Sequence, residues 1–423
     1  MNYFLQDADT ARRVQRWMAI SCLALIAATW RLWTPQTEFP QVPAFAILCT
    51  APGWLDWICL VCMLSGLLAL SIGCSRTGNI VAYLLVLMAL PLSACLDQHR
   101  VQPWAYQLWL FASIWLCCGL PLGLNLMRWL LISVYVYSAL GKLDYEFLHS
   151  VGQQMLAAMA RLCGQDSSTI PMSVRLGLVA TFPVTELLVG IGLAWPKTRR
   201  VAGLLAIGFH VVLVVLLGPL GLNHRLGVLI WNVQFAILAY LLFVAGGERR
   251  TARDAESFDS NSFWQAGLQR LCCLWIATVI ALPCTERFGL WDHWPSWALY
   301  APHSSRVRIE VTTPVLGRLP AELLGWMNLP KQVDELALEW IDVPIDMWSL
   351  QSLGTPIYPQ ARYQLGVAKH LASAIDSEFD VRLTILSNAN RWNGERQSRV
   401  FEGSSPIANA GGDYWWNTAP RRW

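Results

Sequence analysis

The chain contains repeated runs of apolar residues that are long enough to cross a lipid bilayer. A helix needs about 20 predominantly apolar residues to span the hydrocarbon core. Of the residues, 55% are hydrophobic and only 14% are charged, against about a quarter charged in a soluble domain. We therefore predict an α-helical integral membrane bundle of about nine transmembrane helices. The candidate segments are Trp17–Trp33, Trp54–Gly73, Asn79–Cys95, Trp104–Leu120, Leu124–Leu140, Leu176–Trp195, Val201–Leu217, Leu226–Val244 and Trp264–Pro283.

The last third of the chain differs from the rest in composition. Residues 1–284 contain 18 Lys/Arg and 13 Asp/Glu, whereas the shorter stretch 285–423 contains 13 and 15. Within that stretch Arg306–Val311 alternates apolar and polar residues, as a half-buried strand does, and Val381–Leu386 offers a second strand. Tyr363–Ile375 has helical spacing. We predict a transmembrane domain over residues 1–284 and a small α+β extramembrane domain over residues 285–423.

Basic residues favour one side of the membrane. Cytoplasmic loops carry an excess of Lys and Arg, and a cytoplasmic N-terminus gives a two-to-one bias in that direction. Nine crossings then place everything after Pro283 on the non-cytoplasmic face. The predicted cytoplasmic set is Arg12, Arg13, Arg16, Arg76, Arg128, Lys197, Arg199, Arg200, Arg249, Arg250, Arg253 and Arg270, and the outer set is Arg31, Arg100, Lys142, Arg161, Arg175 and Arg225.

Several functional classes lack support in the sequence. The net charge of +3 is not gathered into a basic patch interleaved with aromatic residues, so we expect no nucleic-acid partner. The histidines never pair at metal-ligand spacing, and we expect no structural metal. The lipid bilayer is the one partner that the composition itself requires.

Ionisable residues inside apolar spans are costly and therefore mark candidate functional sites. Lys142 follows Tyr135 and Tyr137 at the outer end of the fifth predicted span, with Asp144 just beyond it. A desolvated lysine can act as a base near neutral pH. The alternative is a lysine that extends toward the membrane surface and pairs with Asp144.

Glu186 and His210 lie within the sixth and seventh predicted spans. Glu186 follows Pro183, where a broken helix leaves room for a polar partner, and a buried carboxylate either pairs or takes up a proton. The alternative for Glu186 is an ion pair inside the bundle with Arg175 or with another helix. His210 is either a ligand or proton acceptor or a hydrogen-bonded packing residue.

The connection after the third predicted span, CLDQHRVQPWAYQ, gathers polar residues on the outer side. Asp97, His99, Arg100 and Tyr106 cluster there as a candidate ligand-binding site, with Asp97 and Tyr106 as its binding residues. The alternative is an ordinary solvated loop.

Several of these residues occur in an order that resembles a known family. YVYSALGKLDYEFL resembles the fifth-span signature of the horizontally transferred transmembrane (HTTM) domain family, which includes vitamin K-dependent gamma-carboxylases and is related to DoxX-like membrane proteins. An acidic residue, a basic turn followed by Gly, and then Phe-His follow in the second half, here at Glu186, Lys197–Gly203 and Phe209 with His210. The resemblance covers roughly Arg12 to Pro283.

The resemblance implies a particular chemistry. A lysine at the position of Lys142 would deprotonate a reduced isoprenoid quinone, and the oxygenated quinone would then remove a γ-proton from a glutamate side chain before CO2 adds. On this hypothesis Lys142 and His210 are catalytic, and Asp144, Glu186, Tyr135, Tyr106 and Asp97 bind substrate or cofactor. The resemblance also implies a bacterial inner membrane and a periplasmic C-terminal domain.

The chain departs from the carboxylases at two points. They carry a functional histidine near the start of span four, where this chain has Trp104 or Ala105, and their outer region is much longer. Two function classes therefore stay open. One is a carboxylase-like, quinol-dependent enzyme that acts on a protein or peptide glutamate. The other is a non-catalytic, DoxX-like anchor that presents its periplasmic domain to a protein partner. Transport is a third class, against which the odd span count and the lack of an inverted repeat argue.

Overall fold

The structure is a computed structural model that describes residues 2–245, 263–327 and 339–422. The described residues form two compact units. The first, which we call the helical unit, comprises residues 1–27, 62–88 and 103–302. The second, the sheet unit, comprises residues 28–61, 89–102 and 303–423. Two of the boundaries between the units fall well inside helices, in α2 (Trp54–Ile72) and α3 (Arg76–Leu96).

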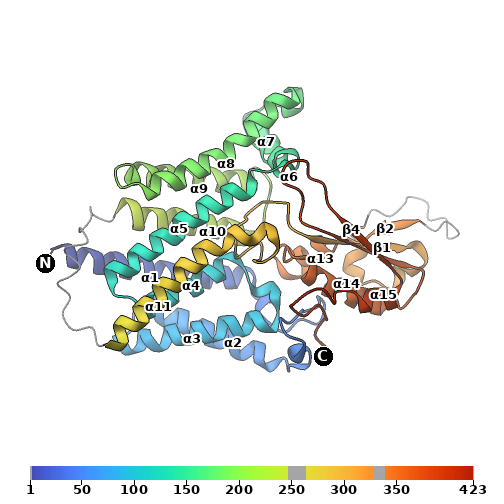
Figure 1. The fold of residues 1–423 in the computed structure, drawn as a ribbon, viewed down its shortest axis with the longest axis horizontal. Coiled ribbons are helices and arrows are strands. Elements are labelled where there is room, and N and C mark those ends of the chain that lie inside the picture. The colour runs from blue at the N-terminus through green and yellow to red at the C-terminus, as the bar shows by residue number, and fades with distance from the viewer. Residues whose placement is uncertain (1, 246–262, 328–338, 423) are drawn as a thin grey trace. The chain divides into compact units, whose positions relative to one another are not determined.

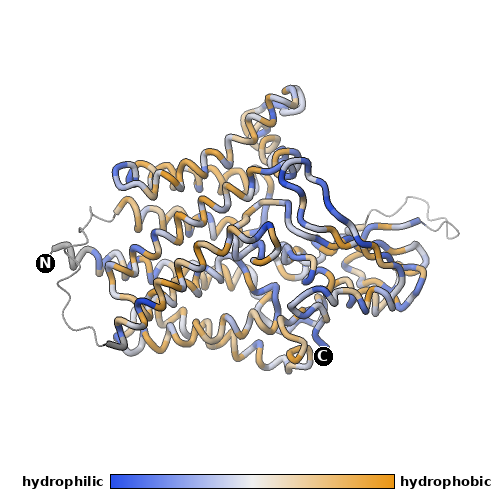
Figure 2. The backbone as a smooth tube through the Cα atoms, in the orientation of Figure 1, coloured by the Kyte–Doolittle hydropathy of each residue, from blue (hydrophilic) through white to orange (hydrophobic). Residues whose placement is uncertain are grey.

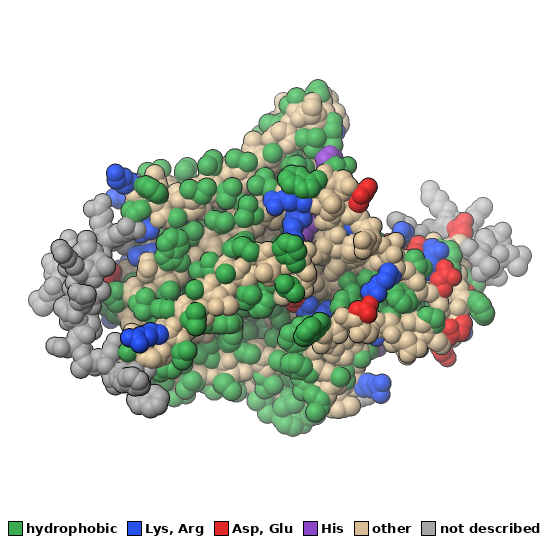
Figure 3. Space-filling model, viewed as in Figure 1, with side chains coloured by type: hydrophobic (Ala, Val, Ile, Leu, Met, Phe, Trp, Pro, Cys, Tyr) green, Lys and Arg blue, Asp and Glu red, His purple; other side chains and the backbone are tan. Residues whose placement is uncertain are grey.

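Long apolar helices make up most of the helical unit (Figure 1). Hydrophobic residues predominate along these helices (Figure 2), and hydrophobic side chains cover most of their surface on the face seen in Figure 3, as expected where lipid rather than water is the solvent. Besides α2 and α3 the helices are α1 (Asn2–Ala28), α4 (Pro103–Cys117), α5 (Leu120–Lys142), α6 (Tyr145–His149), α7 (Val151–Leu162), α8 (Met172–Ala194), α9 (Arg199–Leu217), α10 (Leu226–Ala239) with a π-helical turn Tyr240–Val244, and α11 (Phe263–Ala281) with the 3₁₀ turn Leu282–Phe288.

Seven helices in the described ranges are long and apolar enough to cross a membrane: α2, α3, α5, α8, α9, α10 with its π-turn, and α11 with its 3₁₀ turn. The chain is therefore a multi-pass membrane protein. The other two predicted spans, Trp17–Trp33 and Trp104–Leu120, lie largely within α1 and α4, which are not among these seven helices. α4 has only 15 residues. The apolar part of α1 is preceded in the same helix by Arg12, Arg13 and Arg16.

Close packing of α5 against α8 positions the polar residues of both helices. Gly190 on α8 makes this approach feasible, because a Cβ at this position would lie 3.2 Å from the Cβ of Tyr135 and 3.1 Å from a methyl group of Val136. Glu186 lies one turn before Gly190 and so shares its face of α8. Figure 1 shows α8 beside α9, which brings the middle of a third helix to the same region.

The sheet unit is built on a four-stranded antiparallel sheet in the order β2-β1-β3-β4. The strands are β1 (Arg306–Thr312), β2 (Trp340–Asp342), β3 (Val381–Leu386) and β4 (Ser398–Glu402). Arg306 pairs with Leu386 and Val311 with Val381 in the central register. The prediction of strands at the start of β1 and at β3 is confirmed. The short α12 (Ala321–Leu324), α13 (Ile345–Leu353), α14 (Ala361–Ile375) and α15 (Ser404–Asn409) complete the α+β arrangement.

Two loops from the first hundred residues belong to the sheet unit. α14 packs against β1 and β3 and also against the first of these loops, since a Cβ at Gly366 would meet the side chain of Val42. The end of the chain follows the same loop, with the amide of Asn417 donating to the carbonyl of Ala44 at 3.0 Å and that of Arg422 to Cys49 at 2.8 Å. The sheet and these two loops therefore fold together as one body.

Candidate functional site

An ion pair at the end of α5 is the first element of the candidate site. Lys142 Nζ lies 2.6 Å from Glu186 Oε2 and donates a hydrogen bond to Ser138 Oγ at 2.7 Å. Lys142 is the last residue of α5, Ser138 lies one turn earlier, and Glu186 comes from the middle of α8. All three side chains are buried. The sequence left Glu186 with several partners, and the structure selects Lys142.

A chain of hydrogen bonds deeper in the bundle forms the second element. Tyr135 Oη lies 2.8 Å from His210 Nε2, and His210 Nδ1 lies 3.0 Å from Asn232 Oδ1. Asn232 uses its amide nitrogen to donate to the carbonyl of Val228 at 2.9 Å, which leaves its oxygen to accept from His210. His210 therefore carries a proton on Nδ1, and Nε2 accepts the hydrogen bond that the Tyr135 hydroxyl donates.

The two elements are connected through α5. Tyr135 and Lys142 lie seven residues apart on α5 and therefore on the same face of that helix, so the charge of the ion pair and the hydrogen-bond chain occupy one face. Four helices, α5, α8, α9 and α10, thus direct polar groups into one region of an otherwise apolar bundle. We call this set, Tyr135, Ser138, Lys142, Glu186, His210 and Asn232, the buried polar cluster.

Two members of the cluster were missed in the sequence. Ser138 lies four residues before Lys142 and therefore on the same helical face, a spacing that could have identified it. Asn232 stands among apolar residues in LGVLIWNVQF. An amide inside a span is a detectable signal, but its partner lies on another helix and cannot be found from spacing.

Asp144 has a structural environment of its own. Its carboxylate accepts from the backbone N–H of Phe147 at 2.8 Å, which caps the short helix α6, and it pairs with Arg287 at 2.9 Å. The pair joins the end of α5 to the turn that follows α11. The structure thus pairs Lys142 with Glu186 and Asp144 with Arg287.

Tyr106 lies beside a strained segment that packs near Lys142. The centroid of its ring lies 5.3 Å from that of Trp297 with the two planes tilted, and its buried hydroxyl has no hydrogen-bond partner among the described residues. Trp297 and Tyr300 both have φ of 59°, a conformation that costs free energy for bulky residues. A Cβ at Gly141, next to Lys142, would contact Ala298 at 3.5 to 3.6 Å. The segment therefore covers the end of α5.

Asp97 belongs to the sheet unit, whereas the members of the buried polar cluster belong to the helical unit. It accepts from the backbone N–H groups of His99 and Val42 at 3.2 and 3.3 Å, and burial raises its pKa to about 6. His99 is also buried and contacts Pro356 O at 2.7 Å and the Tyr363 hydroxyl at 3.2 Å. Desolvation lowers the pKa of His99 to about 4. These contacts join the loop after α3 to the C-terminal domain.

A fully buried group of charges in the same unit was not predicted from the sequence. Asp56 pairs with Arg100 at 2.5 Å and with Arg421 at 2.8 Å, and all three side chains are 0% exposed. Arg421 also donates to the carbonyls of Ala51 and Pro52. The three residues come from the start of α2, the loop after α3 and the end of the chain. We call them the Asp56 charge group.

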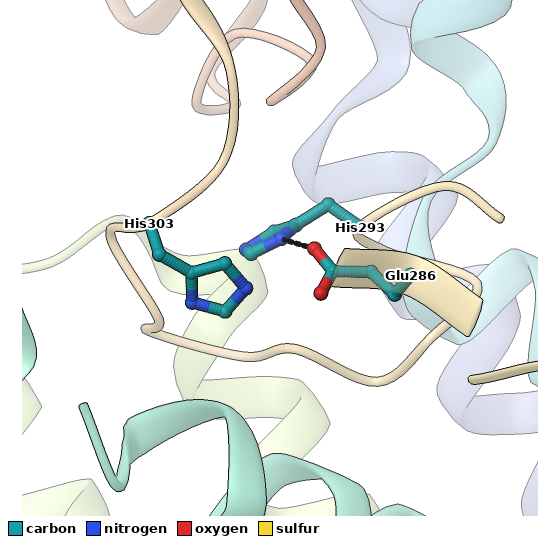
Figure 4. Close-up of side chains that lie close together, drawn as sticks. All are labelled: Glu286, His293 and His303. Carbon is teal, nitrogen blue, oxygen red and sulfur yellow. Dashed lines mark hydrogen bonds and ion pairs between the residues drawn. The ribbon is translucent and has the colours of Figure 1, made fainter. Parts of the chain in front are cut away.

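A further buried pair lies after α11 in the helical unit. His293 Nδ1 lies 2.8 Å from Glu286 Oε1, the dashed contact in Figure 4, and His293 Nε2 lies 2.9 Å from the carbonyl of Ala301. This imidazole holds the strained segment in place through a side chain and a backbone group. His303, which Figure 4 also draws, is the first residue of the next stretch of the sheet unit.

Comparisons of the chain with protein-family models, with curated proteins and with solved structures find no match. The geometry of the buried polar cluster is therefore the main guide to function.

Proposed function

We propose that this chain is a multi-pass membrane enzyme of the HTTM type, in which the buried polar cluster takes a proton from a reduced isoprenoid quinone so that a protein or peptide glutamate can be carboxylated. The observation that carries the proposal is the 2.6 Å contact between Lys142 and Glu186 inside an apolar bundle. A cation and an anion are costly there and are retained where they serve a function.

The Lys142–Glu186 pair has the chemistry of a proton acceptor. On this proposal a proton passes from the Lys142 ammonium to the Glu186 carboxylate across their 2.6 Å contact. The neutral amine that remains has a free electron pair and accepts a proton from a hydroxyl placed beside it. Ser138 holds Nζ in position through its 2.7 Å hydrogen bond.

The Tyr135–His210–Asn232 chain provides a second proton path. Asn232 keeps the His210 proton on Nδ1, which leaves Nε2 free to take the proton of the Tyr135 hydroxyl. His210 is a positioning and proton-holding residue on this proposal, and Tyr135 is its hydrogen-bond partner at Nε2.

The surroundings of Lys142 suit a lipid-soluble quinol. The amine lies at the end of a span, where the head of an isoprenoid lipid resides, and the buried Tyr106 hydroxyl is available as a hydrogen-bond donor. A quinol bound here would supply, after deprotonation and oxygenation, a base strong enough to remove the γ-proton of a glutamate before CO2 adds, as the resemblance to the carboxylases implies. Asp144 fixes the adjoining turns, and Asp97 supports the sheet unit that would present the peptide.

Oxygen uptake by the purified chain in nanodiscs with menaquinol tests this proposal. General-base catalysis contributes about 10²- to 10⁴-fold, so Lys142→Ala should lose at least about a hundredfold of the uptake above the protein-free rate. Lys197→Ala, in the loop before α9, is the matched control and should retain it. Wild-type uptake no faster than the protein-free rate, or equal uptake by Lys142→Ala, would overturn the assignment.

The second candidate function is a DoxX-like anchor that presents the sheet unit to a protein partner. It is favoured by the large apolar side chains that this unit exposes, among them Phe379 and Trp392. A partner that copurifies with the wild-type chain and is lost from Phe379→Ser or Trp392→Ser would support it. A copurifying protein that both variants retain would contradict it.

The proposal includes a topology in which α4 also crosses the membrane. The loop after α3 and the C-terminal segment belong to one compact unit, so the chain between them makes an even number of crossings. Among the described residues, five candidate spans lie in that interval, α5, α8, α9, α10 and α11. A sixth is required, and α4 is the best remaining helix, since α6 and α7 have 5 and 12 residues. Its 15 residues reach about 22 Å. Most of its side chains are buried, which relaxes the length needed against lipid.

A further inference from the structure

Part of the sheet unit exposes large aromatic and aliphatic side chains next to the start of α2. Trp415 is fully exposed and Ile47 is 84% exposed, and Phe45 and Trp416 are each about half exposed. The rings of Phe45 and Trp416 lie 5.4 Å apart, so the C-terminal segment and the loop before α2 form one surface. Isolated exposed apolar residues are ordinary, but a contiguous set of this kind marks an interaction surface.

This surface is rigidly attached to α2. The backbone of Asn417 bonds to Ala44 and that of Arg422 to Cys49, on either side of the exposed Ile47. Between them in the chain, Arg421 is fully buried against Asp56 in the first turn of α2. The exposed aromatic residues therefore stay at a fixed distance from the first turn of this helix.

The first turns of α2 continue the same surface into the membrane. The exposed apolar residues Trp54, Trp57, Ile58 and Val61 recur at helical spacing and define one face. α2 is a candidate span, and a face of this kind contacts lipid. Tryptophan is enriched where a span meets the interface, because its ring is apolar and its N–H is polar.

We propose that Phe45, Ile47, Trp54, Trp57, Trp415 and Trp416 form an interfacial collar that docks the sheet unit on the surface of a phospholipid bilayer. The partner is the headgroup and upper acyl region. The exposed guanidinium groups of Arg422 and Arg31 complement lipid phosphates, and Arg31 lies 5.7 Å from the ring of the half-exposed Trp30. The bilayer, together with the Asp56 charge group, would thus hold the C-terminal end of the chain in place. This inference does not depend on the proposed enzyme activity.

Photo-crosslinking of the full chain in nanodiscs tests the collar. The nanodiscs contain phosphatidylcholine, phosphatidylglycerol and a phospholipid with a diazirine near the glycerol, and adducts are mapped by peptide mass spectrometry. We expect adducts on the peptides that carry Ile47, Trp57 and Trp415. We expect none on Trp392, which is 82% exposed in the turn between β3 and β4 and serves as the control for mere exposure.

Trp415→Glu provides the second measurement, and because Trp415 is fully exposed the substitution removes no buried surface from the fold. One negative charge near an anionic surface should lower the adduct yield on the Trp415 peptide about fivefold, which corresponds to about 1 kcal/mol. The yield on the Trp57 peptide should stay unchanged. Adducts on Trp57 but not on Trp415 in the wild-type chain would overturn the proposal, and so would labelling of Trp392 equal to that of Trp415.

Discussion

The ammonium of Lys142 lies 2.6 Å from the carboxylate of Glu186, and both side chains are no more than 10% exposed. The contact joins the end of α5 to the interior of α8. It fixes the rotation of these two helices about each other and gives the bundle a charged centre. Its energetic and chemical consequences can be measured separately.

Breaking the Lys142–Glu186 pair from one side should destabilise the protein strongly. Lys142→Met leaves a buried carboxylate without its cation, which costs about 3–5 kcal/mol. The double variant Lys142→Met with Glu186→Leu should recover most of that loss, as thermal unfolding in detergent would show. The exposed pair Arg13–Asp9 is the control, and Arg13→Met should cost less than about 1 kcal/mol. Additive losses in the double variant would contradict the interpretation.

The tautomer of His210 should depend on Asn232. Nitrogen-15 NMR of histidine-labelled protein should show a neutral ring with the proton on Nδ1, assigned by the signal missing from His210→Gln. Asn232→Leu removes the acceptor of that proton and should shift the signal toward the other tautomer. An Asn232→Asp variant should keep the Nδ1 proton, because the carboxylate also accepts it. The same spectrum in Asn232→Leu as in the wild type would refute this hydrogen-bond assignment.

The Asp56 charge group should respond unequally to the loss of its members. Asp56→Asn leaves two buried guanidinium groups without their anion, whereas Arg421→Met leaves the Asp56–Arg100 pair intact. We expect Asp56→Asn to cost at least about 3–5 kcal/mol and Arg421→Met clearly less. Arg421→Met should also expose the C-terminal peptide to protease, since three backbone carbonyl contacts are lost with it. Equal losses of thermal stability in the two variants would be inconsistent with this ordering.

Protonation of Asp97 and protonation of His99 should change the stability of the folded protein in opposite directions as the pH falls. The folded-state pKa of His99, about 4, lies below the ordinary 6.5, so the unfolded chain binds the proton first and stability falls as the pH drops from 6.5 toward 4. The folded-state pKa of Asp97, about 6, lies above the ordinary 3.8, so stability rises as the pH drops from 6 toward 3.8. The two effects nearly cancel in the wild-type chain.

Variants should separate these two titrations. Asp97→Asn should lose more stability than the wild type between neutral pH and about pH 5, and His99→Gln should lose less. Thermal unfolding of the detergent-solubilised protein at both pH values measures the difference. Identical acid sensitivity in Asp97→Asn and His99→Gln would rule out these assignments.

Reporter fusions should reveal the crossing by α4. Fusions after Arg100 and after Arg287 should report the outer compartment, and fusions after Gly119 and after Gly247 the cytoplasm. The decisive comparison is Arg100 with Gly119, which flank α4. If both fusions report the same compartment, α4 does not cross the membrane. Another segment would then have to supply the sixth crossing between the loop after α3 and the C-terminal segment.

The sequence by itself determined that much of the chain lies in lipid, and which segments form helices and strands. Nearly every apolar run forms a helix because a chain in lipid must satisfy its backbone hydrogen bonds internally, and the alternation at Val307, Ile309 and Val311 specified a strand in which these three side chains are buried. It also identified Lys142, Glu186 and His210 as costly residues, because a charged or polar side chain in an apolar run is visible without any fold.

Only the tertiary structure decided which of these residues meet. The rotation and pairing of the helices decide which side chains meet, so Lys142 pairs with Glu186 rather than with a neighbour in the sequence, and Asn232 on α10 fixes His210 on α9. The same limit applies to Arg421, which spacing gave no reason to place against Asp56 in the first turn of α2. Hydropathy depends on the order of residues along one segment, whereas a buried charge pair depends on how distant segments pack, and that packing depends on the whole chain.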